Sequence, residues 1–126
     1  LVLIPMDALL IEQVLLNLLD NAVKHAQGMT RLSLKVFTLG DQAIFEVADN
    51  GCGIPADRLP SIFSGTQAQD GRPADSNKRS AGIGLSVCAT IIKAHGGHIR
   101  AENARDGGAI FRFDLALEEE SHEQQV

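Results

Sequence analysis

The chain has 126 residues, 44% of them hydrophobic, and a formal net charge of −5 at pH 7. This length fits one domain with one buried core, and the acidic balance, with five Phe and no Trp or Tyr, argues against nucleic-acid binding. No run of about 18 apolar residues is present, so we expect no transmembrane segment and no direct membrane contact. Cys52 and Cys88 lack CxxC spacing and are expected to be free thiols. Because the chain starts with LVLIP rather than Met, we expect it to be a piece of a longer protein.

The first half of the chain predicts a helix followed by a β-hairpin. The opening LVLI suits a short strand end. Asp7 is a good N-cap, and the apolar periodicity predicts a helix over 8–27 that ends at Gly28. The β-rich runs RLSLKVFT and QAIFEVAD, joined at Gly40-Asp41, predict a hairpin. NGCGIP is a turn cluster, and Pro60 limits ADRLPSIF to one or two helical turns.

The second half predicts a second helix and a second hairpin after a long polar stretch. Up to position 81, the stretch that starts at Ser64 has only alanines as apolar side chains. GLSVCATIIKAH predicts a helix over 84–95, and HIRAENA and AIFRFDLAL predict a hairpin that turns at RDGG. The remaining residues, 118–126, form a polar tail. This order predicts an α+β two-layer sandwich, with helices on one face of a mixed, mostly antiparallel sheet.

One side of the first predicted helix carries a polar stripe. At 100° per residue the stripe comprises Gln13, Asn17, Asp20, Asn21 and Lys24. Leu10, Val14 and Leu16 flank it, and the core side holds Ala8, Ile11, Leu15, Leu18, Leu19, Ala22 and Ala26. A solvated face is one explanation. The other is a site for a hard cation with its phosphates, because Asn is a weak helix former and amide oxygens suit such ions.

Two glycine turns are candidate ligand sites. Asp49 ends a strand just before Gly51 and Gly53, which suits either an ordinary turn or a carboxylate that accepts a hydrogen bond from a planar ligand. Gly82 and Gly84 precede the second predicted helix, where free N–H groups can bind an anion. No strand precedes this GxG and no GK[ST] follows it, which excludes a Rossmann fingerprint and a Walker A loop.

Together, NxxxN on a helix, DxGxG after a strand and GxGL before a helix resemble the catalytic, ATP-binding domain of sensor histidine kinases. This is the HATPase_c domain, with the Bergerat or GHKL fold. The resemblance covers Met6–Leu117: NLLDNAVKHA is similar to the N box, DNGCGIP to the G1 box, IF to part of the F box and GIGLSV to the G2 box. It implies a catalytic domain over 1–117 and a tail over 118–126. PMDALLIEQVLLNLLDNAVKHA and IIKAHGGHI look most like the potassium-responsive KdpD group.

The resemblance also implies a role for each matched residue. Asn21 would ligate Mg²⁺ at the ATP phosphates, Asn17 would sit near the γ-phosphate, and Lys24 would neutralise phosphate charge; these three are the implied catalytic residues. His25 would present its ring to adenine, and Asp49 would accept the adenine amino hydrogen. The other implied ATP-binding residues are Gly51, Gly53, Ile54, Lys78, Arg79, Gly82, Ile83, Gly84 and Leu85. For Lys78 and Arg79 the alternative to a phosphate contact is that they are solvated charges of a loop.

The implied function is that of a two-component kinase domain, with residues 64–81 as a lid that orders over ATP. It would bind Mg-ATP and pass the γ-phosphate to a histidine on a separate dimerisation domain, and the response regulator is the next implied partner. The parent protein would be a membrane-anchored sensor with this domain in the cytoplasm. The fragment alone would be a monomer that binds ATP without autophosphorylation. Asn17 stands where related hydrolases carry a carboxylate base, which disfavours assisted hydrolysis.

Two departures from the family pattern leave alternatives open. Phe63 has no second Phe a few residues later, hence no aromatic partner to pin the lid, and Ser80 stands where the family usually has Gly. The alternatives are a kinase-inactive nucleotide-sensing or protein-interaction module on the same fold, and a Bergerat-type ATPase.

Overall fold

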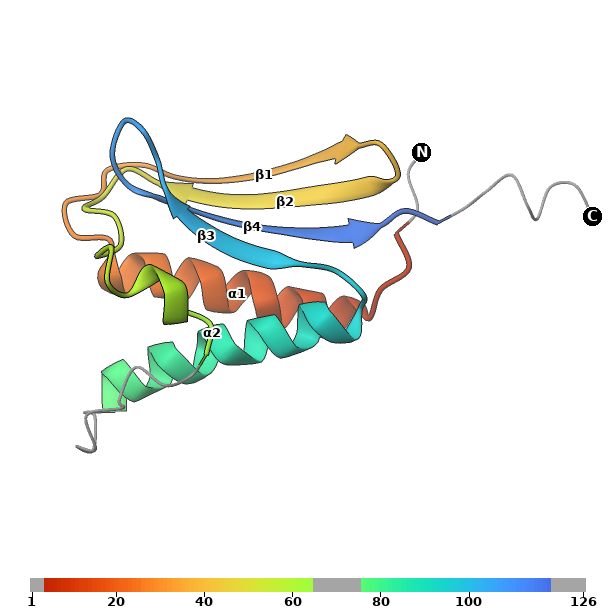
Figure 1. Cartoon of the computed structure of the whole chain (residues 1–126), viewed down its shortest axis with the longest axis horizontal. Helices are drawn as coiled ribbons and strands as arrows, with labels where there is room; N and C mark the ends of the chain where they lie inside the picture. Colours follow the sequence, from red (N-terminus) through yellow and green to blue (C-terminus); the bar gives the residue numbers. More distant parts are fainter. Residues whose placement is uncertain (1–3, 65–75, 119–126) are drawn as a thin grey trace, which may run out of the picture.

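The computed structural model describes residues 4–64 and 76–118, with side chains for all of them except 76–83. Two helices lie against one face of a four-stranded sheet, which gives the predicted two-layer α+β architecture (Figure 1). In chain order the elements are α1 (Ala8–His25), β1 (Leu32–Leu39), β2 (Gln42–Asp49), the 3-10 turn η1 (Leu59–Ser61), α2 (Ser76–Ala94), β3 (Ile99–Asn103) and β4 (Ala109–Ala116). Among these residues, neither helix has the length and apolar character needed to cross a bilayer.

The first helix begins at the residue that the sequence predicts. The Oδ1 atom of Asp7 accepts hydrogen bonds from the N–H groups of Leu9 and Leu10, at 3.1 and 3.2 Å. The helix ends at His25, two residues earlier than predicted, and Gly28 then adopts a φ of 78° that favours glycine. Local capping chemistry therefore defines the start of α1, whereas Gly28 lies in the turn after the C-cap residue Ala26.

The strand order is β1-β2-β4-β3, and all three pairings are antiparallel. Leu39 pairs with Gln42 across Gly40, and Asn103 pairs with Ala109, so both predicted hairpins are confirmed. No parallel pair occurs among the described strands, so the sheet is antiparallel rather than mixed. The last strand, β4, lies in the interior of the sheet.

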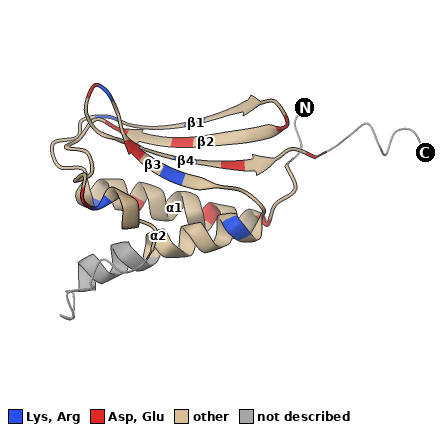
Figure 2. Cartoon of the chain, in the orientation of Figure 1, with Lys and Arg blue, Asp and Glu red and all other residues tan. Residues whose placement is uncertain are grey.

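Charged side chains on adjacent strands pair across the sheet. The Nε atom of Arg112 on β4 donates to Oε2 of Glu46 on β2 at 2.7 Å, and its Nη1 donates to Oε1 of Glu102 on β3 at 3.1 Å. Figure 2 shows the acidic and basic positions on these neighbouring strands. Arg112 therefore links three strands.

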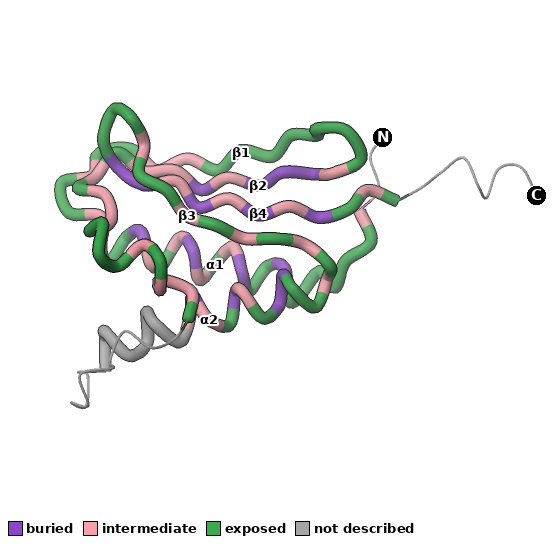
Figure 3. The backbone as a smooth tube through the Cα atoms, viewed as in Figure 1, coloured by how far each residue is buried: buried purple, intermediate pink, exposed green. Residues whose placement is uncertain are grey.

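The core lies between the two layers, where Figure 3 shows the buried segments of α1, α2, β2 and β4. The rings of Phe45 and Phe113 stack there with centroids 4.7 Å apart. Of the seven positions expected on the core side of α1, Ile11, Leu18 and Ala22 are buried, Leu15, Leu19 and Ala26 are half-buried, and Ala8 is exposed at the first turn. Val14, expected beside the polar stripe, is fully buried because α2 packs along that side of α1.

The second helix starts eight residues before its predicted start. It begins at Ser76, so 76–81 of the predicted lid is helical, and 65–75 lies outside the described residues. Lys, Arg and Ala are strong helix formers, and an interior glycine costs only about 1 kcal/mol, so the glycines at 82 and 84 do not end the helix. Residues 1–3 of the predicted first strand and 119–126 of the predicted tail also lie outside the described residues.

Candidate functional site

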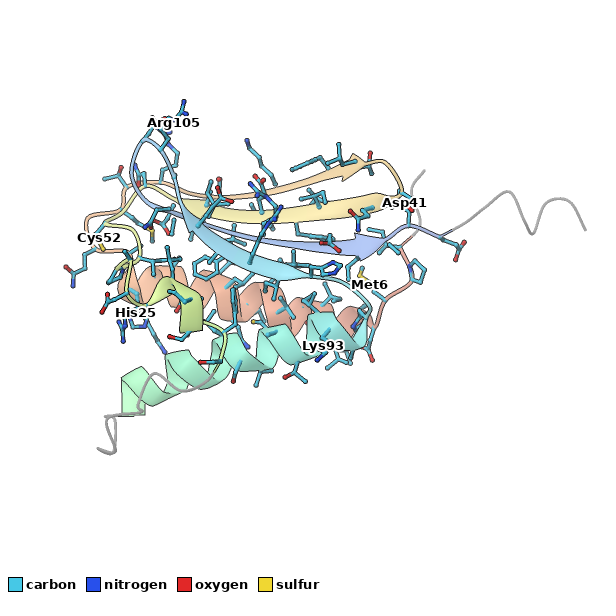
Figure 4. The ribbon with its side chains drawn as sticks, viewed as in Figure 1. Met6, His25, Asp41, Cys52, Lys93 and Arg105 are labelled. Carbon is cyan, nitrogen blue, oxygen red and sulfur yellow. The ribbon has the colours of Figure 1, made fainter. Side chains whose placement is uncertain are left out.

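A pocket opens at one end of the two layers, beside the last turn of α1. Figure 4 shows His25 and Cys52 at this end of the molecule, and Asp41 and Met6 at the other. The residues that line it come from α1, from the loop after β2 and from β4: Asn21, Ala22, His25, Ala26, Asp49, Gly53, Ile54, Ala109 and Phe111. The structure thus brings together five of the predicted site residues, which are Asn21, His25, Asp49, Gly53 and Ile54.

Asp49 is held rigidly at the pocket wall. Its Oδ1 atom accepts hydrogen bonds from the N–H of Gly51 at 2.8 Å and from the N–H of Ala109 at 3.3 Å. Its Oδ2 atom has no hydrogen-bond partner among the described residues. A carboxylate whose orientation is fixed and whose second oxygen is available is a well-placed acceptor for a donor group of a ligand.

The loop after β2 approaches α1 closely because its first glycine has no side chain. A Cβ atom on Gly51 would lie 2.9 Å from the Cβ and the backbone carbonyl of Ala26. Gly51 itself is not a lining residue of the pocket. Its contribution is to let the loop pack onto the end of α1, which sets the distance between His25 and the loop.

Two asparagines that the sequence reasoning missed hold this region in place. The Oδ1 atom of Asn50 accepts hydrogen bonds from the N–H groups of Thr30 and Arg31, each at 2.8 Å. Asn103, at the end of β3, bonds to both backbone groups of Ile54, at 2.7 and 2.9 Å. Both asparagines bond to residues that are distant in the sequence, so local patterns could not reveal these contacts. The position of Asn103 beside a predicted turn was the one available signal that its side chain can bond to backbone groups.

Phe111 on β4 is a further missed residue of the pocket. Its ring packs edge to face against Phe63, with centroids 6.0 Å apart. The sequence suggested that Phe63 lacks an aromatic partner, because none follows it closely. The strand order supplies one from the distant strand β4, so Phe63 is fixed against the wall of the pocket.

The polar stripe of α1 is divided between two places. Asn21 lines the pocket, whereas the side chain of Asn17 contacts α2: its Nδ2 donates to the carbonyl of Gly84 at 3.2 Å, and its Oδ1 accepts from Nε2 of Gln13 at 2.8 Å. Lys24 pairs with Asp20 at 3.1 Å on the surface. Of the three residues implied to be catalytic, Asn21 is therefore the one among the described lining residues of this pocket.

His25 is the titratable ring at the pocket. Partial burial lowers its pKa below the ordinary value of 6.5, and the positive charges of Arg58 and Lys24 lower it further, against a smaller opposing effect of Asp20. His25 is therefore neutral at pH 7, which suits contact with an uncharged ring.

The second glycine pair does not lie at a helix start. Gly82 and Gly84 are the seventh and ninth residues of α2, and beyond the first four residues helical N–H groups are bonded within the helix. The prediction that these glycines stand at the start of the helix is therefore wrong, whereas their implied contact with the ATP phosphates stays a prediction. Leu85 is buried in the core. The side chains of Lys78, Arg79 and Ile83, and the surroundings of Gly82, lie outside the described residues.

The sequence matches known proteins over most of its length. Residues 6–119 match the family described as histidine kinase-, DNA gyrase B-, and HSP90-like ATPase (HATPase_c). The chain is 42% identical over 117 residues to the sensor protein KdpD of Clostridium acetobutylicum, covering 93% of this chain and 13% of that protein. It is 39% identical over 132 residues to the sensor protein KdpD of Escherichia coli strain K12, covering 98% of this chain and 14% of that protein. The chain thus spans about one seventh of the length of these relatives.

The structure also matches solved ones. The nucleotide-free catalytic domain of histidine kinase ThkA superposes with a TM-score of 0.71 and 28% identity, over 90% of this chain and 70% of that chain. This likeness confirms the predicted GHKL (Bergerat) fold. The chain therefore belongs to the family of histidine kinase-, DNA gyrase B- and HSP90-like ATPases, as an ATP-binding catalytic domain of the sensor histidine kinase type that is similar to that of the KdpD sensors.

Proposed function

We propose that this domain binds Mg-ATP in the pocket beside α1 and transfers the γ-phosphate to a histidine on a separate dimerisation domain. The observation that carries the proposal is the fixed carboxylate of Asp49, whose Oδ2 is available at the wall of the pocket. The family match and the similarity to KdpD support it. A response regulator would receive the phosphoryl group next, and the domain would lie in the cytoplasm as part of a membrane-anchored sensor. The isolated domain would be a monomer, and the full-length protein a dimer through its dimerisation domain.

The pocket suits an adenine ring. Its lining combines the apolar side chains of Ala22, Ile54 and Phe111 with the single carboxylate of Asp49. A carboxylate in apolar surroundings favours a ligand that donates a hydrogen bond, as the exocyclic amine of adenine does. The neutral ring of His25 can pack against the base without placing a charge there.

The phosphates and Mg²⁺ would lie further along α1. Asn21 would contribute its amide oxygen to Mg²⁺, and Asn17 and Lys24, on the same side of the helix, would approach the phosphates. Among the described residues, no group of three or more His, Cys, Asp or Glu side chains could hold a metal. Since Mg²⁺ is commonly bound through one or two protein oxygens together with substrate phosphates, the ion would arrive with ATP and neutralise its charge.

The side chain at position 17 favours transfer over hydrolysis. An amide cannot take a proton from water at neutral pH, so Asn17 gives water attack no assistance. A neutral imidazole on a partner domain needs no such base because it is already nucleophilic. The domain would then contribute positioning and charge neutralisation, as is general in phosphoryl transfer.

Titration of the chain with a fluorescent ATP analogue tests the proposal. We expect Mg²⁺-dependent binding that Asp49→Asn weakens by about tenfold or more, since it removes a charge-assisted hydrogen bond. Asp41→Asn is the matched control, because Asp41 lies at the opposite end of the sheet (Figure 4). Absence of binding at millimolar nucleotide, or an Asp49→Asn variant that binds like the wild type, would contradict the proposal.

A second experiment separates the kinase from its alternatives. The chain is mixed with the dimerisation domain of the parent protein and radiolabelled ATP. Transfer of label to that domain supports the kinase. Binding without transfer indicates a nucleotide-sensing module, and steady release of phosphate by the chain alone indicates an ATPase.

A further inference from the structure

We propose that Asn103, at the end of β3, is a positioning residue of the nucleotide pocket that holds the backbone of Ile54 against the ligand. The proposal rests on the function proposed above. Asn103 is not among the residues that line the pocket, so it would act through its neighbours rather than by touching the nucleotide.

The first observation is a pair of hydrogen bonds. Residues 53–55 form neither helix nor strand, so their backbone groups need partners from elsewhere. The Oδ1 atom of Asn103 accepts from the N–H of Ile54 at 2.7 Å, and its Nδ2 donates to the carbonyl of Ile54 at 2.9 Å. One carboxamide thus binds both polar groups of a single residue, as a neighbouring strand would.

The second observation is the fit between Asn103 and Gly53. Gly53 has a φ of 80°, and a Cβ atom placed on it would lie 2.8 Å from Oδ1 of Asn103. A side chain at position 53 would therefore be strained and would push the carboxamide away. The carboxamide of Asn103 can therefore reach Ile54 only because position 53 is a glycine.

The third observation is that one hairpin holds both walls of the pocket. Asn103 is the last residue of β3 and binds Ile54. Ala109 is the first residue of β4, and its N–H binds Oδ1 of Asp49 at 3.3 Å. The turn between them is closed by a hydrogen bond from the N–H of Ala104 to the carbonyl of Gly108 at 2.8 Å. The hairpin therefore sets the spacing between Asp49 and Ile54, which is the width available to a planar base.

The two hydrogen bonds between Asn103 and Ile54, here called the clamp, also determine which group of Ile54 can face a ligand. Because its N–H and carbonyl are both occupied by Asn103, the group left to face a ligand is its side chain, which is half-buried against the core. Asn103 would thus keep this wall apolar and leave recognition of the polar edge of the base to Asp49.

The variant Asn103→Ala tests the proposal in two independent measurements. Hydrogen exchange by NMR should show faster exchange of the Ile54 amide, with the amides of β1 and β2 unchanged. Titration with the ATP analogue should show a dissociation constant raised about tenfold, because the loop at Ile54 would no longer be held in place before binding and part of the binding free energy would be spent on ordering it. Gln42→Ala is the matched control, since it removes a carboxamide that bonds to Asp114 at the other end of β2, and it should change neither result.

Two further variants keep the test decisive. Asn103→Asp retains the acceptor for the N–H of Ile54 but loses the donor, so it should protect the amide and still weaken nucleotide binding. In an Ile54→Ala background, Asn103→Ala should weaken binding by less than it does alone, because the side chain that it positions is gone.

The outcomes separate this proposal from the function it rests on. Unchanged exchange at Ile54 in Asn103→Ala overturns the clamp, whatever the binding result. Faster exchange with a dissociation constant within twofold of the wild type overturns the positioning role, as does an undiminished effect in the Ile54→Ala background. If the wild type binds no nucleotide, the proposed function fails and the positioning role is overturned with it, while hydrogen exchange still shows whether Asn103 holds the loop.

Discussion

The side-chain amide of Asn17 in α1 donates a hydrogen bond to the backbone carbonyl of Gly84 in α2, over an N···O distance of 3.2 Å. The orientation of the amide is fixed from the other side, because its oxygen accepts from Gln13. Asn17 therefore connects the two helices, and both ends of its amide are occupied in this structure. To approach a phosphate or Mg²⁺, its oxygen would have to exchange Gln13 for the ligand.

Replacing Asn17 by Asp should destabilise the domain. The substitution replaces the donor that faces the carbonyl of Gly84 by an acceptor, and we expect a loss of about 1–3 kcal/mol in the free energy of unfolding. Urea denaturation measures it, with Glu12→Gln at an exposed position of the same helix as the control. A variant as stable as the wild type would show that the contact between Asn17 and Gly84 carries little energy.

Adjacent glycines in the turn between β3 and β4 should differ in their tolerance of alanine. Gly107 and Gly108 have φ values of 106° and 89°, so alanine is strained at both. A Cβ atom on Gly108 would also overlap the carbonyl oxygen of Asp49 and lie 2.7 Å from the Cα of Asn50, whereas one on Gly107 would meet nothing within 4 Å. Gly107→Ala should cost about 1–2 kcal/mol from strain alone.

Gly108→Ala should cost more than that and should also weaken nucleotide binding, because it displaces the backbone of Asp49. Thermal melts and the nucleotide titration compare the two variants. Equal melting temperatures and equal affinities would mean that the turn moves away without disturbing Asp49.

The two cysteines should react at very different rates. Cys52 is exposed in the loop after β2, whereas Cys88 is buried, and burial raises the pKa of the Cys88 thiol to about 11. Iodoacetamide at pH 8 should therefore modify Cys52 alone in the folded protein and both cysteines in urea. Mass spectrometry of the digested protein gives the answer. Modification of Cys88 without denaturant would indicate that the packing of α2 against α1 opens readily.

Protonation of His25 should oppose folding below neutral pH. Because the pKa of His25 is lowered in the folded state, the unfolded chain binds the proton more tightly. Stability is therefore unaffected above the unfolded pKa near 6.5 and falls as the pH decreases from there through the folded pKa. NMR titration of the ring should give a midpoint below 6.5, and Arg58→Gln should move it upward. A midpoint above 6.5 would reverse the sign of the effect.

The stacked phenylalanine pair should dominate the stability of the core. Phe113 is 1% exposed and stacks on Phe45, whereas Phe37 on the edge strand is 40% exposed. Phe113→Ala should lower the free energy of unfolding by about 3–5 kcal/mol. Phe37→Ala should cost about 1 kcal/mol or less, since much of its ring is already in water. Chemical denaturation of the two variants checks the difference, and similar losses would show that β1 packs more tightly than its exposure indicates.

The sequence predicted the parts of this domain that depend on neighbouring residues. Asp7 caps α1 through the first turn of the helix, and Gly40 closes a hairpin whose two strands lie directly on either side of the turn. Asp49 could be selected as a candidate ligand residue because its motif is contiguous, and it lines the pocket. Local chemistry was sufficient in each case, since the competing interactions lie within a few residues.

The parts that it did not predict depend on contacts between distant residues. Val14 is buried because α2 packs at the edge of the expected polar stripe, and Asn103 reaches Ile54 only because β3 ends beside that loop. The start of α2 was placed at Gly84 because glycine was read as a break, although helix formers precede it. Helical periodicity and turn signals contain no information on which distant strand or helix will cover a given side.

The interior position of β4 has a consequence for the order in which this domain assembles. Strand β4 follows the other described strands in the chain, yet it separates β2 from β3 and contributes Ala109 and Phe111 to the pocket. A nascent chain that ends before Ala109 can form only the first hairpin and its helices, with the central pairing of the sheet missing. Since such long-range pairing forms slowly, we expect the pocket to form late in folding, and a chain that ends before Ala109 would lack two of the residues that line it.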